Sequence, residues 1–219
     1  MKPVFLLLSF FLIGVLIIVY YKTYTVARMT QALTTPMSQS IPFSLAVPPP
    51  ESLKGSIVSF SDDIQWQSRE ATVPAQLAIK VPVFQGEDFW TGEKGKLVIE
   101  FLNTLTIQVF PTTHIALIQT LPDNFVMLQD SGKANYINTS IHTPISIRVS
   151  PLIVQEEKGE IEIEKDDELT RTTITVKKGA VTIGFNDSDN ISNVVRVSEG
   201  SVYTFDNEAR TGEVSIRDE

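Results

Sequence analysis

From about Leu53 onward, apolar and polar residues alternate along most of the chain. The alternation is visible in short runs such as SIVSF, LVIEF, LTIQV, EIEIE, TITVK and SVYTF. A period of two in Val, Ile, Thr and Phe predicts half-buried strands, and the Gly, Pro, Asn and Asp between the runs predict turns. No long stripe with helical period occurs after residue 28. The pattern predicts an all-β domain over residues 53–219, a sandwich, jelly roll or barrel of about twelve strands.

Residues 89–115 raise the question of whether a Trp, a Glu and a His among apolar neighbours form a site. Placed on strands, Glu100 points outward, away from the apolar row. The inward row is expected to contain Leu97, Ile99, Phe101, Leu105, Ile107, Val109, Ile115, Leu117 and Gln119. Because this row accounts for the core face of a meander, we interpret the stretch as scaffold.

A short repeat recurs in the second half of the chain. VKKGAVTI at 176–183 and VSEGSVYTF at 197–205 lie twenty-one residues apart, and LQDSGKANY at 128–136 is a looser copy. In each copy a Gly flanked by polar residues is expected to turn the chain between two strands or to bulge one strand.

The N-terminal segment has a different pattern. Residues 4–21 read VFLLLSFFLIGVLIIVYY, eighteen residues without a charge, with Lys22 and three Tyr residues at the end. This length nearly matches a hydrocarbon core of roughly 30 Å and predicts a transmembrane helix preceded by a tail of residues 1–3. A cleaved signal peptide is the alternative, with Thr25-Val26-Ala27 as a poor cleavage site.

Residues 22–52 join the apolar segment to the β region. No Asp, Glu, Lys or Arg occurs between Arg28 and Glu51, and the stretch is rich in Ser, Thr, Gln and Pro. Three successive prolines at 48–50 favour extended polyproline geometry, so we expect a stalk; an ordered edge strand is the alternative. Flanking charges are nearly balanced and leave the orientation undecided. The Ser/Thr/Pro-rich stalk resembles surface spacers, so we expect residues 1–3 to be a cytoplasmic tail and the β region to be extracytoplasmic.

The net charge and the absence of cysteine exclude several classes of partner and of chemistry. The chain has a formal net charge of −8 at pH 7 and no Lys/Arg cluster, so we expect no nucleic-acid partner. It contains no Cys, which excludes disulfides, thiol catalysis and cysteine-bearing metal sites.

Candidate catalytic groups are scarce. The two histidines, His114 and His142, have no nucleophile or second ligand nearby in sequence, and no Gly-x-Ser-x-Gly elbow occurs. We therefore expect neither enzymatic activity nor a cofactor. Trp66, Phe89 and Trp90 are candidates for an exposed aromatic platform that binds a sugar or peptide, with core packing as the alternative.

Two oxygen-rich segments are candidates for calcium. The acidic run 156–168 is interpreted as a solvated edge strand, with Glu160, Glu162 and Glu164 on one face. The loop 186–190 reads NDSDN and offers Asp187 and Asp189 as ligands, but it lacks the Gly and distal Glu of an EF-hand. We expect no metal site, with calcium at Asp187 and Asp189 as the alternative.

Residues 53–206 resemble a FecR-type domain, in which a Gly-x-Val strand, a Trp and a Thr-Gly turn precede a Leu-x-Phe hairpin and a Pro-x-Thr-x-Ile strand. The matching positions are Gly55, Val58, Trp66, Thr91, Gly92, Ile99, Phe101, Asn103, Ile107, Pro111, Thr113, Ile115, Thr173, Val176, Lys178, Gly179 and Val181. The sequence departs from the pattern at Asn103-Thr104, where the family has Asp-Gly.

The resemblance implies a β-sandwich or jelly-roll-like domain on the outer side of a bacterial membrane. The best-known family members carry a signal through a cytoplasmic N-terminal region to a sigma factor, a region not expected here because the predicted helix begins at residue 4. The expected function is therefore a non-enzymatic, membrane-anchored, extracytoplasmic binding or scaffolding module whose partner is a protein or a cell-wall polymer. A transmembrane signalling regulator acting with a separate partner protein is the alternative.

Overall fold

The computed structural model describes Tyr20 and residues 47–61, 63–166 and 168–216. From residue 47 onward these ranges form strands and turns without a helix, which confirms the all-β prediction for this part of the chain. The predicted membrane segment 4–21 lies outside the described residues except for Tyr20, as do residues 22–46 of the predicted stalk. Among the described residues, no helix is long and apolar enough to cross a membrane.

The strands form two sheets that share the long strand β9 (Asn124–Asn138). In spatial order, sheet A contains β4 (Pro82–Val83), β1 (Gly55–Phe60), β6 (Leu97–Phe101), β7 (Leu105–Val109), the second half of β9, β12 (Gly159–Asp166), β13 (Arg171–Lys178), β16 (Ser201–Asp206) and β17 (Thr211–Ile216). Sheet B contains β3 (Ala75–Gln76), β2 (Ile64–Gln67), β5 (Asp88–Thr91), β8 (His114–Leu121), the first half of β9, β10 (Ile145–Val149), β11 (Leu152–Glu156), β14 (Ala180–Asn186) and β15 (Ser192–Ser198).

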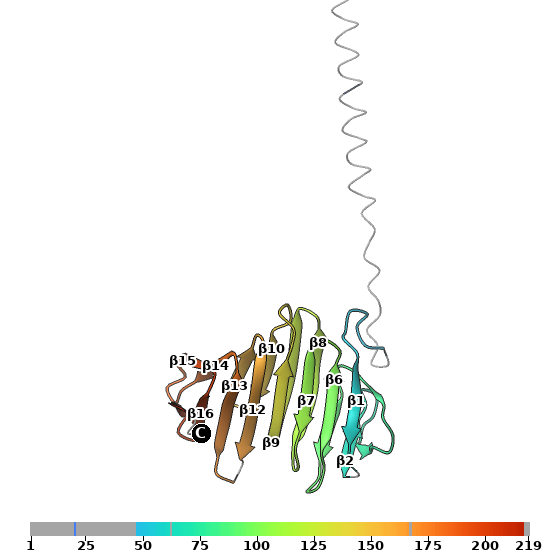
Figure 1. Cartoon of the computed structure of the whole chain (residues 1–219), viewed down its shortest axis with the longest axis horizontal. Coiled ribbons are helices and arrows are strands. Elements are labelled where there is room, and N and C mark those ends of the chain that lie inside the picture. The colour runs from blue at the N-terminus through green and yellow to red at the C-terminus, as the bar shows by residue number, and fades with distance from the viewer. Residues whose placement is uncertain (1–19, 21–46, 62, 167, 217–219) are drawn as a thin grey trace, which may run out of the picture. The chain divides into compact units, whose positions relative to one another are not determined.

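The chain advances along the sandwich by hairpins that alternate between the sheets. The pairs β10–β11 and β14–β15 lie in sheet B, whereas β12–β13 and β16–β17 lie in sheet A. Figure 1 shows the result as a progression from cyan β1 at one end to red β16 at the other. Four of the connections after β9 are hairpins within one sheet, whereas β9 and β10 run parallel. These hairpins replace the long crossings of a jelly roll, so the sandwich part of the expectation fits and the jelly-roll part does not.

The apolar residues that alternate along the strands meet between the two sheets as one core. The expected inward row from Leu97 to Leu117 is buried, which confirms the predicted core face. The predicted meander is wrong, because β6 and β7 pair in sheet A whereas β8 pairs with β5 and β9 in sheet B. Gln119 is a correction: a bulge between Leu117 and Gln119 shifts the alternation, so that Thr120 is buried and Gln119 only half-buried. The alternation of apolar and polar residues therefore predicts the buried face of the strand correctly, except where a β-bulge shifts the alternation by one residue.

The three repeat glycines adopt positive φ, as a turn or bulge requires. Gly179 (φ 83°) and Gly200 (φ 78°) lie in the turns after β13 and β15. Gly132 (φ 75°) lies inside β9, where the strand leaves sheet B and enters sheet A. The predicted turn-or-bulge role of all three glycines is confirmed.

Candidate functional site

The crossing of β9 between the sheets forms a tightly bonded corner. Thr113, at the entry to β8, donates its hydroxyl to the Lys133 carbonyl oxygen at 3.0 Å and accepts from the Lys133 backbone N–H at 2.8 Å. Thr91 donates to the Phe110 carbonyl oxygen at 2.6 Å and accepts from the Thr113 N–H at 2.8 Å. Buried Thr113 thus bonds the backbone of β9 where the strand changes sheets, and buried Thr91 in turn bonds the backbone on either side of Pro111 and Thr112.

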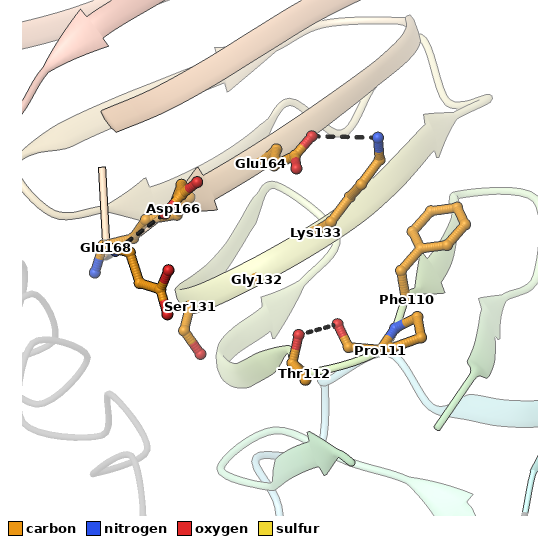
Figure 2. A pocket seen from close by; sticks show the side chains of 10 residues that line it. Phe110, Pro111, Thr112, Ser131, Gly132, Lys133, Glu164, Asp166 and Glu168 are labelled. Atoms are coloured by element: carbon orange, nitrogen blue, oxygen red, sulfur yellow. Dashed lines mark hydrogen bonds and ion pairs between the residues drawn. The ribbon is translucent and has the colours of Figure 1, made fainter. Parts of the chain in front are cut away.

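An open cleft of about 640 Å³ lies at this corner. Figure 2 shows side chains from three segments around it: the loop after β7, the corner of β9 and the tip of the β12–β13 hairpin. The lining residues are Phe110, Pro111, Thr112, Ser131, Gly132, Lys133, Glu164, Lys165, Asp166 and Glu168. The lining mixes one aromatic ring, hydroxyl groups and charges of both signs, which suits a hydrogen-bonding ligand better than an apolar one. We call it the corner cleft.

The charged groups of the corner cleft are held in place by neighbours. Lys133 Nζ lies 2.6 Å from Glu162 Oε1 and 3.3 Å from Glu164 Oε2, and 6.0 Å from the centre of the Phe110 ring. The hydrogen bond to Glu162 raises the pKa of Lys133 above its usual value. Asp166 Oδ1 accepts from the backbone N–H groups of Glu168 and Leu169, which fixes the hairpin tip.

A second cleft, of about 310 Å³, adjoins the first through Lys165, which lines both. Its lining residues are Ser150, Pro151, Lys165, Thr170, Asn207, Glu208 and Arg210, from the β12–β13 hairpin and the tips of two further connections, β10–β11 and β16–β17. Lys165 Nζ also donates to the Asp130 carbonyl oxygen and so links the hairpin tip to the corner. The two clefts together, here called the end groove, extend across the hairpin tips at one end of the sandwich strands.

The end groove contains residues other than Gly in left-handed backbone conformations, which such residues rarely adopt. Thr112 (φ 54°) and Thr170 (φ 48°) are β-branched residues in the left-handed region, and Arg210 (φ 54°) lies there too. Each such conformation costs on the order of 1–3 kcal/mol and persists only where surrounding contacts enforce it. Strain of this kind is concentrated at functional sites, so its presence in both clefts marks the groove as a candidate site.

The acidic strand is not a solvated edge, and that expectation is wrong. β12 pairs with β9 on one side and β13 on the other, in the middle of sheet A. Lys177 Nζ lies 3.0 Å from Glu162 Oε2 and 3.6 Å from Glu160 Oε1, so cations from the neighbouring strands offset the acids. Burial raises the pKa of Glu162, but its hydrogen bonds with Lys133 and Lys177 outweigh this effect and leave the pKa below its usual value.

Glu156, at the start of the same acidic run, is fully buried between the sheets. Neither of its carboxylate oxygens has a hydrogen-bond partner among the described residues. Burial, with a smaller contribution from the negative charge of Glu160, raises the pKa of Glu156 to about 8. The expectation of a solvated carboxylate is therefore wrong here as well, because strand alternation turns position 156 inward.

The three candidate aromatic residues do not form one platform. Phe89 is fully buried, and Trp66 packs beside it against the core. Trp90 lies on the outer face of sheet B and stacks on His114, with ring centres 4.4 Å apart and planes inclined by 13°. Trp66 and Trp90 lie on neighbouring strands but on opposite faces of sheet B, so the sheet separates the two rings.

His114 has neighbours that the sequence does not reveal. Its Nε2 lies 3.2 Å from Asp88 Oδ1 and its Nδ1 lies 3.5 Å from Asp130 Oδ2. The ring is thus held between two carboxylates and an indole on the outer face of sheet B, beside the corner of β9.

Trp66 lines a separate cavity of about 300 Å³ with Arg69, Phe84 and Glu87 among its walls. Burial raises the pKa of Glu87 above its usual value, and the Phe84 N–H, Trp66 and Arg69 partly offset that effect. Trp66 Nε1 and Arg69 Nη1 are buried without a hydrogen bond of good geometry to the described residues.

Asp187, one of the two calcium candidates, accepts hydrogen bonds from its own loop and the strand that follows it. Asp187 Oδ1 accepts from the N–H groups of Asp189 and Ile191, and Oδ2 accepts from Asn193. These bonds, first of all the one from Ile191, lower the pKa of Asp187. Within the part of the chain that the structure describes, no three His, Asp or Glu side chains converge as metal ligands would.

The sequence patterns did not indicate that the end-groove residues lie together, although Pro111 belongs to the FecR-type match and Glu164 to the acidic run 156–168. These residues come from tips of connections far apart along the chain, and no spacing relates Thr112 to Thr170 or Arg210. The one signal available was the SGK of the looser repeat, which marked Gly132 as a bend in β9.

Comparison with known proteins bears on the fold alone. No protein-family model matches the chain, and no curated protein matches it. Two crystal structures of a candidate anti-sigma factor from Parabacteroides distasonis, at 1.65 Å and 2.50 Å resolution, match with TM-scores of 0.52 and sequence identities of 11% and 12%. In both cases the match covers 60% of this chain and 60% of the other. The described β domain is thus similar in fold to these anti-sigma factor candidates, in agreement with the direction of the FecR-type resemblance.

Proposed function

We propose that this protein is a non-enzymatic binding module of the bacterial cell envelope, anchored in the membrane by residues 4–21 with its β domain outside. The end groove is its binding site, and the ligand is an extended hydrophilic polymer, either a segment of a partner protein or a cell-wall polymer. The observation that carries this proposal is the continuity of two polar clefts through Lys165, with strained backbone in each.

The chemistry of the groove supports an extended, hydrogen-bonding ligand. Hydroxyl groups of Thr112 and Ser131 and the ring of Phe110 lie at one end, and Asn207 and Arg210 lie at the other. Such a row offers donors and acceptors in succession rather than one enclosed pocket, which suits a chain of repeating units. The clefts are walled by ladder-bonded hairpins, so the groups that contact a ligand are preorganised.

Crosslinking in cells tests the proposal. A photo-crosslinking amino acid at Glu168, on the exposed rim of the corner cleft, is expected to capture the ligand in the full chain. The matched control is Lys158, an exposed position in the turn before β12, at the other end of that strand. Arg210→Glu is expected to lower the yield at Glu168 severalfold because it reverses a charge in the second cleft.

The products distinguish the two ligand classes. Peptides of a second protein in the Glu168 product identify a partner protein, and a product shortened by a muramidase identifies a wall polymer. Equal products at Glu168 and Lys158, or none at Glu168, would contradict binding in the end groove.

A transmembrane signalling regulator is the second candidate function. The observation that favours it is the similarity of fold to the anti-sigma factor candidates. It predicts that the full chain, purified from membranes in mild detergent, retains a separate membrane or cytoplasmic protein through residues 1–28. Loss of that protein when residues 4–21 are replaced by an unrelated membrane helix would support this function.

A further inference from the structure

The two ends of the sandwich differ in how their sheet edges are protected. At the β1 end, the outermost strands β3 and β4 contain two residues each, and Pro82 lies in β4. At the other end, the outermost strands are β15 with seven residues and β17 with six, and neither contains Pro or Lys. Short strands and Pro are the usual protection of an edge, and long unprotected edges pair with other strands. The C-terminal end therefore carries two edges that are open to pairing.

At this end, sheet A extends beyond the last strand of sheet B, so part of the inner face of sheet A is uncovered. Val214 pairs with Tyr203 and Ile216 with Ser201, which places both on the face that elsewhere forms the core. Yet Val214 is 50% exposed and Ile216 is 83% exposed, because the last strand of sheet B does not reach over them. The Tyr203 hydroxyl, next to Gly212, is buried without a partner among the described residues. Val214 and Ile216 therefore form an exposed apolar surface on the face that elsewhere forms the core.

The occupant that fits this end is a second copy of the same end. A two-fold axis along the sheet normal brings β17 of each copy together antiparallel in one layer, with the inner faces of the two A sheets on the same side. Val214 and Ile216 of both copies then lie next to one another, and the open edge of β17 is paired in each copy.

The sequence of β17 is compatible with pairing to itself. In a register centred on Val214, Glu213 lies opposite Ser215 and Gly212 lies opposite Ile216. No like charges face one another, and the missing side chain at Gly212 leaves room for the exposed Ile216 of the other copy.

We propose that this protein forms a symmetric dimer through its C-terminal end, with the two β17 strands paired antiparallel about Val214. The dimer is independent of the end groove, since β17 supplies none of the groove's lining residues.

Disulfide crosslinking tests the register in the full chain, because the natural sequence has no Cys. Directly opposed residues in an antiparallel pair have Cβ atoms roughly 4.5–5.5 Å apart, and such a pair oxidises readily to a disulfide. Val214→Cys is expected to give a covalent dimer in membranes under mild oxidation. Ile153→Cys is the matched control: it is 54% exposed on the outer face of β11, away from the edge, and is expected to remain uncrosslinked.

Analytical ultracentrifugation gives a second readout on a fragment of residues 44–219, which contains every buried core residue. Ile216→Lys is expected to weaken the dimer at least tenfold, whereas Ile153→Lys is expected to leave it unchanged. Both side chains are exposed, so neither change is expected to unfold the domain. A fragment that stays monomeric at all concentrations, or a Val214→Cys product that contains a different protein, would overturn the proposal.

Discussion

Gly132 lies against Thr112 so closely that a Cβ atom at position 132 would collide with the Thr112 carbonyl oxygen. Both residues have positive φ, and both line the corner cleft. The corner through which β9 passes from one sheet to the other is therefore also the wall of the candidate site. The first two predictions concern these two positions.

Gly132→Ala is expected to destabilise the domain by about 2 kcal/mol or more, because it adds a steric collision to the cost of a left-handed Ala. Gly200→Ala is the matched control: Gly200 has a similar φ of 78°, but a Cβ there meets nothing within 4 Å. The control is expected to cost about 1 kcal/mol. Urea unfolding of the two variants measures the difference, and equal losses would show that the packing against Thr112 is unimportant.

Thr112→Gly is expected to raise the free energy of unfolding by up to about 1 kcal/mol, because Gly adopts φ 54° without strain. Thr113→Gly, one residue on, is expected to lower it, because the Thr113 hydroxyl bonds the Lys133 backbone at both N–H and C=O. If Thr112 lines a binding site, ligand capture at Glu168 falls in the stabilised variant. Destabilisation by Thr112→Gly would contradict stored strain at this position.

Glu156→Gln is expected to remove a pH dependence of stability. The pKa of Glu156 is about 8 in the folded protein, against 4.5 as its ordinary value. Between these two pH values the folded state holds a proton that the unfolded state has lost, so the stability contribution is complete below about pH 4.5 and falls as the pH rises to about 8.

The loss could reach roughly 4 kcal/mol, and a neutral Gln of the same shape does not suffer it. Unfolding free energies at pH 5 and pH 8.5 should therefore diverge between wild type and Glu156→Gln at the higher pH. An identical pH profile for both proteins would show that Glu156 does not titrate in this range.

Lys177→Met is expected to destabilise the domain by about 1 kcal/mol, because Glu160 and Glu162 lose a half-exposed partner in the middle of sheet A. Lys178→Met removes the same charge at the next, exposed position and is expected to have little effect. Added salt should weaken the difference. A double-mutant cycle with Glu162→Gln measures the coupling free energy between Lys177 and Glu162. A coupling near zero would show that this ion pair does not stabilise the domain.

Protease added to intact spheroplasts is expected to cut between Arg28 and Glu51, because the predicted Pro-rich stalk would lack the ladder bonds that protect strands. The β domain is expected to survive as a fragment of roughly 165–170 residues. Cleavage only after permeabilisation would place the domain on the cytoplasmic side and remove the basis for envelope binding.

Several features of this protein are determined by the sequence alone. Alternation sets the face of each residue in a strand, so Leu97, Ile99 and Phe101 are correctly placed in the core. Repeat position and residue type identify Gly132, Gly179 and Gly200 as bends, because Gly tolerates positive φ at no steric cost. These are local properties, and they are sufficient for the all-β assignment.

The order of the strands was decided only by the tertiary structure. The alternation of EIEIE is the same in an edge strand and in a central one, and only pairing with β9 and β13 puts Lys133 and Lys177 beside the glutamates. Glu156 is different, because the alternation of Leu152, Val154 and Glu156 along β11 already points it inward, and the acidic run 156–168 was the misleading signal. The end groove and the open C-terminal edge arise from the meeting of hairpin tips and the staggered ends of two sheets. Neither has a local signature, because both depend on which strands become neighbours.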